Sequence, residues 1–566
     1  MSRPRAEWLF VTALLLFAAG LRFFGLSFGQ PDPQYARSSV PHQLLPMEAP
    51  IHPDEFLFIT LPLQMLVENR LNPKFYHNPS LLIYANYATF ALTGAGQGID
   101  AALRKNLNGR QYAPFHLYVI GRTYSALGGL LAVAATYALA RQMGGRFAAL
   151  TAGLLVTVSL PLVQHAHYTT TSSLAAGFTA VSVWTAFAWL RGGGRHWPLL
   201  ALAAVCAGLA AGSRYNAAAS ALVVGLVGLV GVYRWRARRM LAGVLTTWAL
   251  APLTFVFTTP AVVFDTAFFL EEFRYITGQY LAGIDVQFPM TPWAGLFFEY
   301  RYLALFGLGA SAALLVPFGV YAAWAQRPPL RKLLRHDAAL LYTLILLIYL
   351  AAYSCVNLRT VRPDLSDQML LPVLPQFALL TGLGAAWLYR PLPLKWLTGP
   401  ALALAVVIVP LALTLPFVRQ LTQPDTREIV LAWVYDHLPR GARVHLNGPY
   451  NVPLDPTDYP WTQTYGGQLI APDELLVAGV DYMILSDAWY HNVLRSTAMT
   501  PPDYADDLRA YLDGLDAAFP RIAWIERPVW AGYDWMTHTP SYWHNPGLVL
   551  YCLTKTACAA SGGQAS

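Results

Sequence analysis

The sequence predicts an α-helical polytopic membrane protein that ends in a small α/β domain. Of its 566 residues, 55% are hydrophobic and only 12% are charged, whereas ordinary soluble domains carry roughly 25% charged residues. The mean hydropathy is +0.39. The 41 prolines and 42 glycines agree with this class, because transmembrane helices tolerate both residues. Together these values exclude an ordinary soluble domain.

Eleven apolar runs have about the length that a membrane crossing needs, which is roughly 20 residues. They cover residues 8–28, 115–140, 147–163, 172–190, 197–212, 215–232, 240–258, 297–324, 338–356, 369–388 and 396–418. We therefore expect about eleven transmembrane helices.

Short basic clusters separate these runs and account for much of the net charge of +7. Such clusters are typical of cytoplasmic loops and not of a nucleic-acid surface. If residues 80–94 crossed the membrane, every later cluster would lie outside, so we expect an interfacial helix there. The N-terminus is then cytoplasmic and the C-terminus extracytoplasmic, in a multi-pass protein of the cell membrane.

The same count predicts two domains. Residues 1–418 form a transmembrane domain whose first external loop is 29–114, and residues 419–566 form an extracytoplasmic soluble domain, for which that length is sufficient. The tail contains the strand-like pieces "ARVHLNG", "DYMILSD" and "GLVLYCL" and the helix-like piece "DDLRAYLDGLDAAF". These pieces predict a small α/β module.

The four cysteines have no metal-ligand spacing. Cys552 and Cys558 are close enough in the chain for a disulfide if the tail is outside, but nothing in the sequence requires one. Cys206 and Cys355 lie in apolar runs.

The stretch "APIHPDEFLF" (49–58) sets acids directly after the first apolar run. Charged groups close to a membrane are costly unless they are solvated or functional. Asp54 lies at the start of an expected amphipathic helix, "DEFLFITLPLQMLVENR". Because Asp54 and Glu55 are adjacent, they point about 100° apart in a helix, so one side chain can face a cavity while the other stabilises the local structure. The simpler alternative is that Asp54 only caps the helix.

Other polar groups are expected at the same outer face. They include the candidate binding residues Lys74, His77, Arg122, His167, Arg214, Tyr215, Asn216 and Arg301, together with Asp265, Glu271, Glu272, Arg359 and Arg362. Arginine suits phosphate because its planar fork donates paired hydrogen bonds, although a single arginine can also extend to lipid headgroups. Grouped around one acidic loop, they indicate a phosphate-binding site.

A metal site is the less favoured interpretation. His52, Asp54, His165 and His167 carry ligand atoms, but they come from two loops and a His-x-His spacing is a weak zinc signal. We therefore predict no firm cofactor.

Six segments occur in an order that resembles a known family: "HPDE", "LNPKFYHNPSLLIY", "HYTTTSS", "GLAAGSRYNAA", "TTPAVVFDTAFFLEEFRYITGQY" and "DQMLLPVLPQFALL". The chain resembles the integral-membrane glycosyltransferases of the GT-C class over about residues 25–390. The most similar branch is the protein O-mannosyltransferase-like and aminoarabinose-transferase-like group.

This resemblance implies a GT-C fold and an inverting sugar transfer at the outer membrane face. The donor would be a polyprenyl-phosphate sugar, and the acceptor a hydroxyl on a protein, lipid or glycan. Asp54 matches the family's acidic residue and would be the general base, with Glu55 as its catalytic support. The candidate binding residues named above would hold the substrate and its phosphate.

Two positions depart from the family pattern. Ser172 stands where members often carry an aspartate, and Gln368 stands where an arginine is expected. Either change points to a different donor or a weakened enzyme. The alternatives are a transporter or flippase of a lipid-linked or anionic solute, and a membrane scaffold with a degenerate site. A transporter would place polar groups at the midplane and often show inverted repeats, and the sequence shows neither.

Overall fold

The computed structural model describes most of the chain. The described residues are 3–30, 44–46, 52, 54–95, 112–236, 238–282, 292–326, 329, 333–334, 339–357, 366–448, 451–464, 469–488, 490, 494, 502–526 and 546–561.

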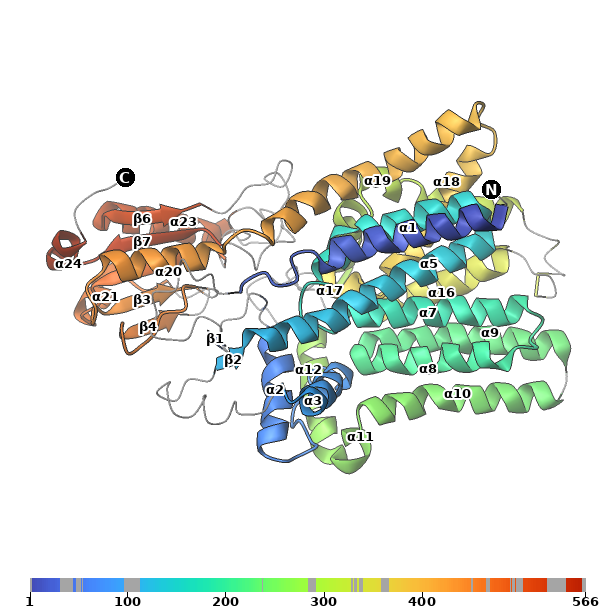
Figure 1. Cartoon of the computed structure of the whole chain (residues 1–566), viewed down its shortest axis with the longest axis horizontal. Coiled ribbons are helices and arrows are strands. Elements are labelled where there is room, and N and C mark those ends of the chain that lie inside the picture. The colour runs from blue at the N-terminus through green and yellow to red at the C-terminus, as the bar shows by residue number, and fades with distance from the viewer. Residues whose placement is uncertain are drawn as a thin grey trace.

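Long helices form a bundle in which most axes run roughly side by side, with the sheet of the C-terminal region at one end (Figure 1). The bundle contains α1 (Arg3–Phe23), α5 (Phe115–Val158), α7 (Ser172–Arg191), α8 (Trp197–Ser213), α9 (Ser220–Trp235), α10 (Arg238–Thr258), α15 (Val316–Ala325), α16 (Ala339–Asn357), α18 (Leu374–Tyr389) and α19 (Lys395–Gln420). Further helices connect them: α6 (Leu160–Gln164), η2 (Tyr215–Ala219), α11 (Ala261–Phe264), α12 (Thr266–Ala282), α13 (Pro292–Tyr302), the π-helix η3 (Leu303–Gly307), α14 (Ala310–Ala313) and α17 (Ser366–Leu370).

The chain is a mostly helical, multi-pass integral membrane protein. Within the described residues, five helices are long and apolar enough to cross a membrane, and a sixth span results if one bent pair of helices counts as a single crossing. The five are Phe115–Val158, Ser172–Arg191, Tyr215–Trp235, Met240–Thr258 and Lys395–Gln420, and the bent pair is Glu299–Gly307 with Ala310–Ala325. All eleven predicted runs are largely helical, but their number as membrane crossings stays a prediction.

The basic cluster at 141–146 interrupts α5, as the sequence predicts. Gly145 has φ 82° and ψ −165°, a conformation that is essentially restricted to glycine. On either side of this break, Arg141 and Arg146 form ion pairs with Glu7 of α1, at 2.6 and 2.9 Å. The N-terminal helix and this cluster therefore lie at the same end of the bundle.

Close helix contacts depend on small side chains, as is usual in membranes. A Cβ added to Gly177 of α7 would lie 2.3 Å from the carbonyl oxygen of Gly128 in α5. Near this contact, the Ser125 hydroxyl donates to the Thr170 carbonyl at 2.8 Å. The turn that precedes α7 is thereby held against α5, where the polar residues described below meet.

The C-terminal region contains a five-stranded mixed sheet in the order β4-β3-β5-β7-β6. Its strands are β3 (Val444–Asn447), β4 (Trp461–Thr464), β5 (Tyr482–Ser486), β6 (Arg521–Ile525) and β7 (Leu548–Cys552), and its helices are α20 (Thr426–His437), α21 (Pro472–Val477), α23 (Pro502–Ala518) and α24 (Lys555–Ala560). The strands β4, β3 and β5 are parallel, and β7 and β6 run antiparallel to their neighbours.

The predicted α/β module is confirmed by this sheet. The four pieces named from the sequence correspond to β3, β5, α23 and β7. The short strands β4 and β6 were not predicted. The sheet packs on α20 through a core that includes Val434, Leu446, Ile484 and Leu550.

Cys552 and Cys558 form a disulfide, and Cys206 and Cys355 are free. The bond joins the end of β7 to α24 across a separation of six residues. Disulfides persist in oxidising compartments, so the bond agrees with an extracytoplasmic tail.

We predict that protein unfolded without reductant exposes two reactive thiols and that reduction raises the number to four. Alkylation followed by intact-mass measurement counts them. A Cys558→Ser variant serves as the control, because it should expose Cys552 as a third thiol without reductant. Four alkylated thiols before reduction would show that the disulfide does not form.

Candidate active site

Two short helices that follow α1 carry the acidic loop. They are α2 (Glu55–Val67) and α3 (Leu81–Thr93), joined where the side-chain amide of Asn86 donates to the Phe58 carbonyl at 2.9 Å. The strands β1 (Leu44–Pro46) and β2 (Tyr112–Pro114) pair antiparallel just before α5. Both helices were predicted, and Asp54 occupies the N-cap position of α2 as expected.

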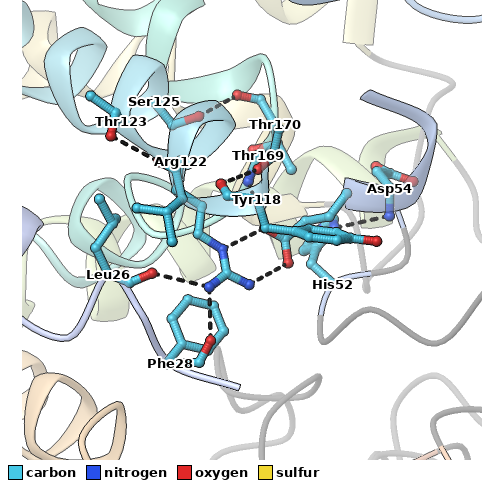
Figure 2. A network of polar contacts seen from close by, with 12 residues as sticks. Leu26, Phe28, His52, Asp54, Tyr118, Arg122, Thr123, Ser125, Thr169 and Thr170 are labelled. Carbon is cyan, nitrogen blue, oxygen red and sulfur yellow. Dashed lines mark hydrogen bonds and ion pairs between the residues drawn. The ribbon is translucent and has the colours of Figure 1, made fainter. Parts of the chain in front are cut away.

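A buried ion pair lies at the centre of this region. The Arg122 Nε donates to Glu55 Oε1 at 2.8 Å, and its Nη2 donates to Glu55 Oε2 at 3.1 Å. The Arg122 Nη1 donates to the carbonyls of Leu26 and Phe28, at 3.0 and 2.8 Å. Glu55 Oε1 also accepts from the Thr169 amide at 2.8 Å. Figure 2 shows how Arg122 lies between the end of the first helix and the start of α2.

This geometry argues against the predicted phosphate-binding role of Arg122 and the catalytic role of Glu55. Their side chains are 1% and 0% exposed, and the guanidinium also stacks on the Phe28 ring at 3.8 Å. A paired, buried charge is not available to a substrate. Both residues instead hold the acidic loop against α5 and the Thr169 turn.

Asp54 differs from its neighbour Glu55. It is half-buried, and its side chain makes no capping hydrogen bond to α2. Its backbone N–H donates to His52 Nδ1 at 3.1 Å. The capping alternative for Asp54 therefore has no support in the structure, and its carboxylate differs from Glu55 in environment, as the 100° offset predicted.

His52 belongs to a buried group of aromatic rings that the sequence analysis did not predict. Its ring centroid lies 4.7 Å from that of Tyr168 and 6.0 Å from that of His165. Its Nε2 lies 3.2 Å from the side-chain nitrogen of Gln368, which is 316 residues away in the chain. The acidic loop therefore contacts α17 through His52.

Arg214 is the last residue in a line of contacts that starts at the Asp54 backbone and passes through His52 and Gln368. It is 8% exposed, and its Nη1 donates to Ser172 Oγ at 2.8 Å and to Gln368 Oε1 at 3.1 Å. Its Nη2 lies 3.5 Å from the Met369 sulfur. Within the described residues, all its contacts are neutral. The two positions that depart from the family pattern, Ser172 and Gln368, thus both contact this one arginine.

Tyr215 and Asn216, which follow Arg214, contact neighbouring segments. The Tyr215 hydroxyl donates to the Tyr76 carbonyl at 2.8 Å. The Asn216 side-chain amide donates to the Tyr353 hydroxyl at 2.8 Å. These contacts hold η2 between the first external loop and α16.

Lys74 and His77 lie apart from this line and pair with acids near α12. Lys74 Nζ contacts Asp265 Oδ2 at 2.8 Å, and His77 Nε2 contacts Glu272 Oε2 at 3.0 Å. Hydrogen bonds from Lys74 and from Asn72 lower the pKa of the Asp265 carboxyl. These pairs fasten the loop before α3 to α11 and α12.

Two further predicted residues, His167 and Arg301, are placed less favourably for binding a substrate. His167 is buried, with Nδ1 2.8 Å from the Val163 carbonyl and Nε2 3.1 Å from the Phe24 carbonyl, so its ring anchors the backbone and does not face a substrate. Arg301 is exposed at the end of α13. Arg359 and Arg362 lie outside the described residues.

Glu299 is a candidate that the sequence analysis missed. It is buried in α13, and its Oε1 has no hydrogen-bond partner among the described residues. The helix packs against α17, which carries Gln368. The available signal was one acid within the apolar run 297–324, since ionisable residues inside membranes are usually functional.

A metal centre finds no support in the part of the chain that the structure describes. There, no group of three or more His, Cys, Asp or Glu side chains is arranged to hold a metal ion.

The comparison with protein families gives one match. Residues 89–276 match the family described as dolichyl-phosphate-mannose-protein mannosyltransferase. The predicted family resemblance is confirmed. This mannosyltransferase-like segment contains Arg122, Ser172 and Arg214, while Asp54 precedes it and Gln368 follows it. No curated protein matches the chain.

The solved structures similar to this chain share little sequence identity with it. ArnT from Cupriavidus metallidurans bound to undecaprenyl phosphate has 13% identity and a TM-score of 0.45, over 98% of this chain and 99% of that chain. The Archaeoglobus fulgidus oligosaccharyltransferase has 13% identity and a TM-score of 0.43, over 91% and 72%. The S. cerevisiae Pmt1–Pmt2 complex bound to the sugar donor has 18% identity and a TM-score of 0.29, over 51% and 36%.

We predict that Glu55→Gln destabilises the protein by about 3–5 kcal/mol, because it leaves the Arg122 charge buried without its partner. Thermal unfolding of the purified protein in detergent measures the loss. Glu68→Gln is the matched control at the end of the same helix: Glu68 pairs with Arg70 but is 55% exposed, so its removal should cost at most about 1 kcal/mol. Equal stabilities of the two variants would contradict the structural role of Glu55.

Proposed function

We propose that the protein transfers a sugar from a polyprenyl-phosphate donor to an acceptor hydroxyl on a protein, lipid or glycan. The family match supports this class of membrane glycosyltransferase. The observation that carries the proposal is the line of contacts that joins Asp54, His52, Gln368 and Arg214. It connects the backbone amide of Asp54, whose side chain is half-buried, to a largely buried cation that has neutral partners. A carboxylate and an unneutralised cation in one site suit proton abstraction beside a leaving phosphate.

In the proposed reaction Asp54 is the general base. It takes the proton of the acceptor hydroxyl while that oxygen forms a bond to the anomeric carbon. The bond between the anomeric carbon and the phosphate oxygen breaks, and its electron pair leaves with polyprenyl phosphate. Attack from the opposite face inverts the anomeric configuration. Such proton transfer contributes typically about 10²–10⁴-fold to the rate.

Arg214 is the proposed phosphate ligand. Among the described residues its guanidinium contacts only Ser172, Gln368 and Met369, all neutral, so its positive charge remains for an anion. A fixed cation at the leaving phosphate stabilises the charge that develops there in the transition state. Arg122 differs because Glu55 already neutralises it.

We also propose the arrangement in the membrane that the sequence predicts. Eleven crossings place the N-terminus in the cytoplasm and divide the chain into a membrane domain, 1–418, and an extracytoplasmic domain, 419–566. The disulfide of the tail supports this orientation. The site then lies at the outer leaflet, where a prenyl chain stays because each buried CH₂ contributes about 0.8 kcal/mol.

A transporter or flippase is the second candidate, and a scaffold with a degenerate site is the third. In the sequence, the departures at Ser172 and Gln368 pointed to a different donor or a weakened enzyme, but both side chains make hydrogen bonds with Arg214. These two hydrogen bonds hold the buried Arg214 in place, which supports a binding site and argues against a degenerate one.

We predict that Asp54→Asn lowers turnover by at least about 100-fold and leaves binding of the lipid donor nearly unchanged, because the amide cannot accept a proton. Release of polyprenyl phosphate from a polyprenyl-phosphate sugar measures turnover. The matched control is Asp265→Asn, whose carboxylate pairs with Lys74 outside the proposed site and should keep most activity. If Asp265→Asn abolishes turnover while Asp54→Asn keeps it, the base lies near α12.

We predict that Arg214→Gln weakens binding of polyprenyl phosphate by about 1.5–3 kcal/mol, the contribution of a hydrogen bond to a charged group. Arg214→Lys keeps the charge and should lose less. Titration calorimetry in detergent measures both. The exposed Arg301→Gln is the control and should bind normally. Unchanged affinity in both Arg214 variants would place the phosphate elsewhere.

A further inference from the structure

The side-chain amide of Asn216 lies against two hydrogen-bond acceptors. Its Nδ2 lies 2.8 Å from the Tyr353 hydroxyl oxygen and 3.5 Å from the Met369 sulfur. The Tyr353 hydroxyl donates its single proton to the Met369 carbonyl, so it presents lone pairs to Asn216. The thioether sulfur has no proton to donate. These two contacts therefore determine which way the NH₂ group of Asn216 points.

This orientation leaves the amide oxygen of Asn216 without a donor. The Oδ1 atom is buried and accepts no hydrogen bond from the described residues. Turning the amide would not satisfy it, because the oxygen would then face the same two acceptors on Tyr353 and Met369. A buried acceptor without a donor destabilises the folded state, so its presence calls for an explanation such as a ligand.

Asn216 and Arg214 meet at the same sulfur atom. Arg214 Nη2 also lies 3.5 Å from the Met369 sulfur, so the two side-chain nitrogens are at most twice that distance apart. Arg214 is 8% exposed and Asn216 is half-buried, so each residue reaches accessible surface. The start of η2 thus brings a cation with neutral partners close to an acceptor that has no donor.

These two groups complement the head of a polyprenyl-phosphate sugar. An ionised phosphate diester offers a negative charge and acceptor atoms, which suit Arg214 but cannot donate to Asn216 Oδ1. The sugar offers hydroxyl groups, which can donate. Because the sugar is bonded directly to the phosphate, its hydroxyls lie at a distance comparable to the separation between Arg214 and Asn216. A phosphate at Arg214 therefore brings suitable donors toward the amide oxygen.

We propose that Asn216 Oδ1 accepts a hydrogen bond from a hydroxyl group of the donor sugar and that Asn216 is thereby a specificity-determining residue. This inference rests on the proposed function, which places the phosphate at Arg214. The sugar supplies the donor that the folded chain does not. A ligand without a hydroxyl at this position leaves the acceptor unpaired, which is how a site built for a hydroxyl discriminates against its absence.

The test compares two lipids of equal charge, one of which lacks the sugar. The reference is polyprenyl methyl phosphate, a phosphate diester without hydroxyls. The second probe is whichever of the polyprenyl-phosphate derivatives of glucose, galactose and mannose the unmodified chain binds most tightly. Titration calorimetry in detergent gives both affinities, and their ratio is the sugar increment. Asn216→Leu should lower this increment by about tenfold and leave binding of the methyl ester nearly unchanged.

Asn216→Asp is the conservative variant. It keeps an oxygen acceptor at the same place, so the sugar increment should persist, although both lipids should bind more weakly because the carboxylate repels their phosphate. Retention of the increment in Asn216→Asp and its loss in Asn216→Leu would separate an acceptor role from simple packing. A loss of the increment in both variants would contradict the acceptor role.

Asn86→Leu is the matched control. The Asn86 Nδ2 donates to the Phe58 carbonyl at 2.9 Å, and its Oδ1 is likewise buried without a partner among the described residues. Asn86 lies in α3 and is not among the hydrogen-bond partners of Arg214. Its replacement should leave the sugar increment unchanged, whatever it does to stability.

Three outcomes would overturn the assignment of Asn216: an unchanged increment in Asn216→Leu, an equal loss in Asn86→Leu, or no hexose derivative that binds more tightly than the methyl ester. Failure of the proposed function has a different result. If Asn216→Leu loses the increment but the unmodified chain releases no polyprenyl phosphate from the preferred derivative, the transfer reaction fails while the sugar contact stands. If transfer proceeds and the increment is unchanged in Asn216→Leu, only the sugar contact fails.

Discussion

The arrangement of the candidate site depends on the buried ion pair between Glu55 and Arg122. This pair joins the carbonyls after α1, the first residue of α2, the N-terminal part of α5 and the Thr169 turn. Among these contacts, Glu55 accepts from the Thr169 amide, which is 114 positions further along the chain. Removing one charge would leave the other buried without a partner in a medium of low dielectric. The packing of all these segments therefore depends on the intact ion pair. Because Asp54 directly precedes Glu55, the pair also determines where the proposed base lies.

The two buried arginines Arg122 and Arg214 differ in the groups that contact their guanidinium, and these groups determine whether the charge is neutralised within the protein. Arg122 has a carboxylate and two carbonyls, and its charge is neutralised within the protein. Arg214 has a hydroxyl, an amide oxygen and a thioether among the described residues. None of these partners of Arg214 carries a charge, so Arg214, unlike Arg122, is not neutralised by its hydrogen-bond contacts.

The proposed position of the site at the membrane surface agrees with the elements that support it. The pairs Lys74–Asp265 and His77–Glu272 attach the first external loop to α11 and α12. Beside them, Val263 and Phe264 are 59% and 86% exposed, as expected for side chains that meet lipid. The loop before α3 is thus paired with elements that carry exposed apolar side chains, and in the proposed function a donor whose prenyl chain remains in the lipid would present its phosphate there. This depth is compatible with the half-buried carboxylate of Asp54.

The sequence by itself determined the membrane class, the helical runs, the α/β tail and the acidic loop with Asp54 at a helix start. Each of these follows from local composition or periodicity, which hydrophobic burial imposes on any chain. Tertiary structure alone decided that Glu55 and Arg122 neutralise each other, that Ser172 and Gln368 meet at Arg214, and that His52 reaches Gln368 across 316 residues. The tertiary structure also determined that the His167 ring contacts the backbone carbonyls of Val163 and Phe24. The reason is physical: a charge or donor takes its role from its buried partners, and those partners come from helices whose packing no local pattern encodes.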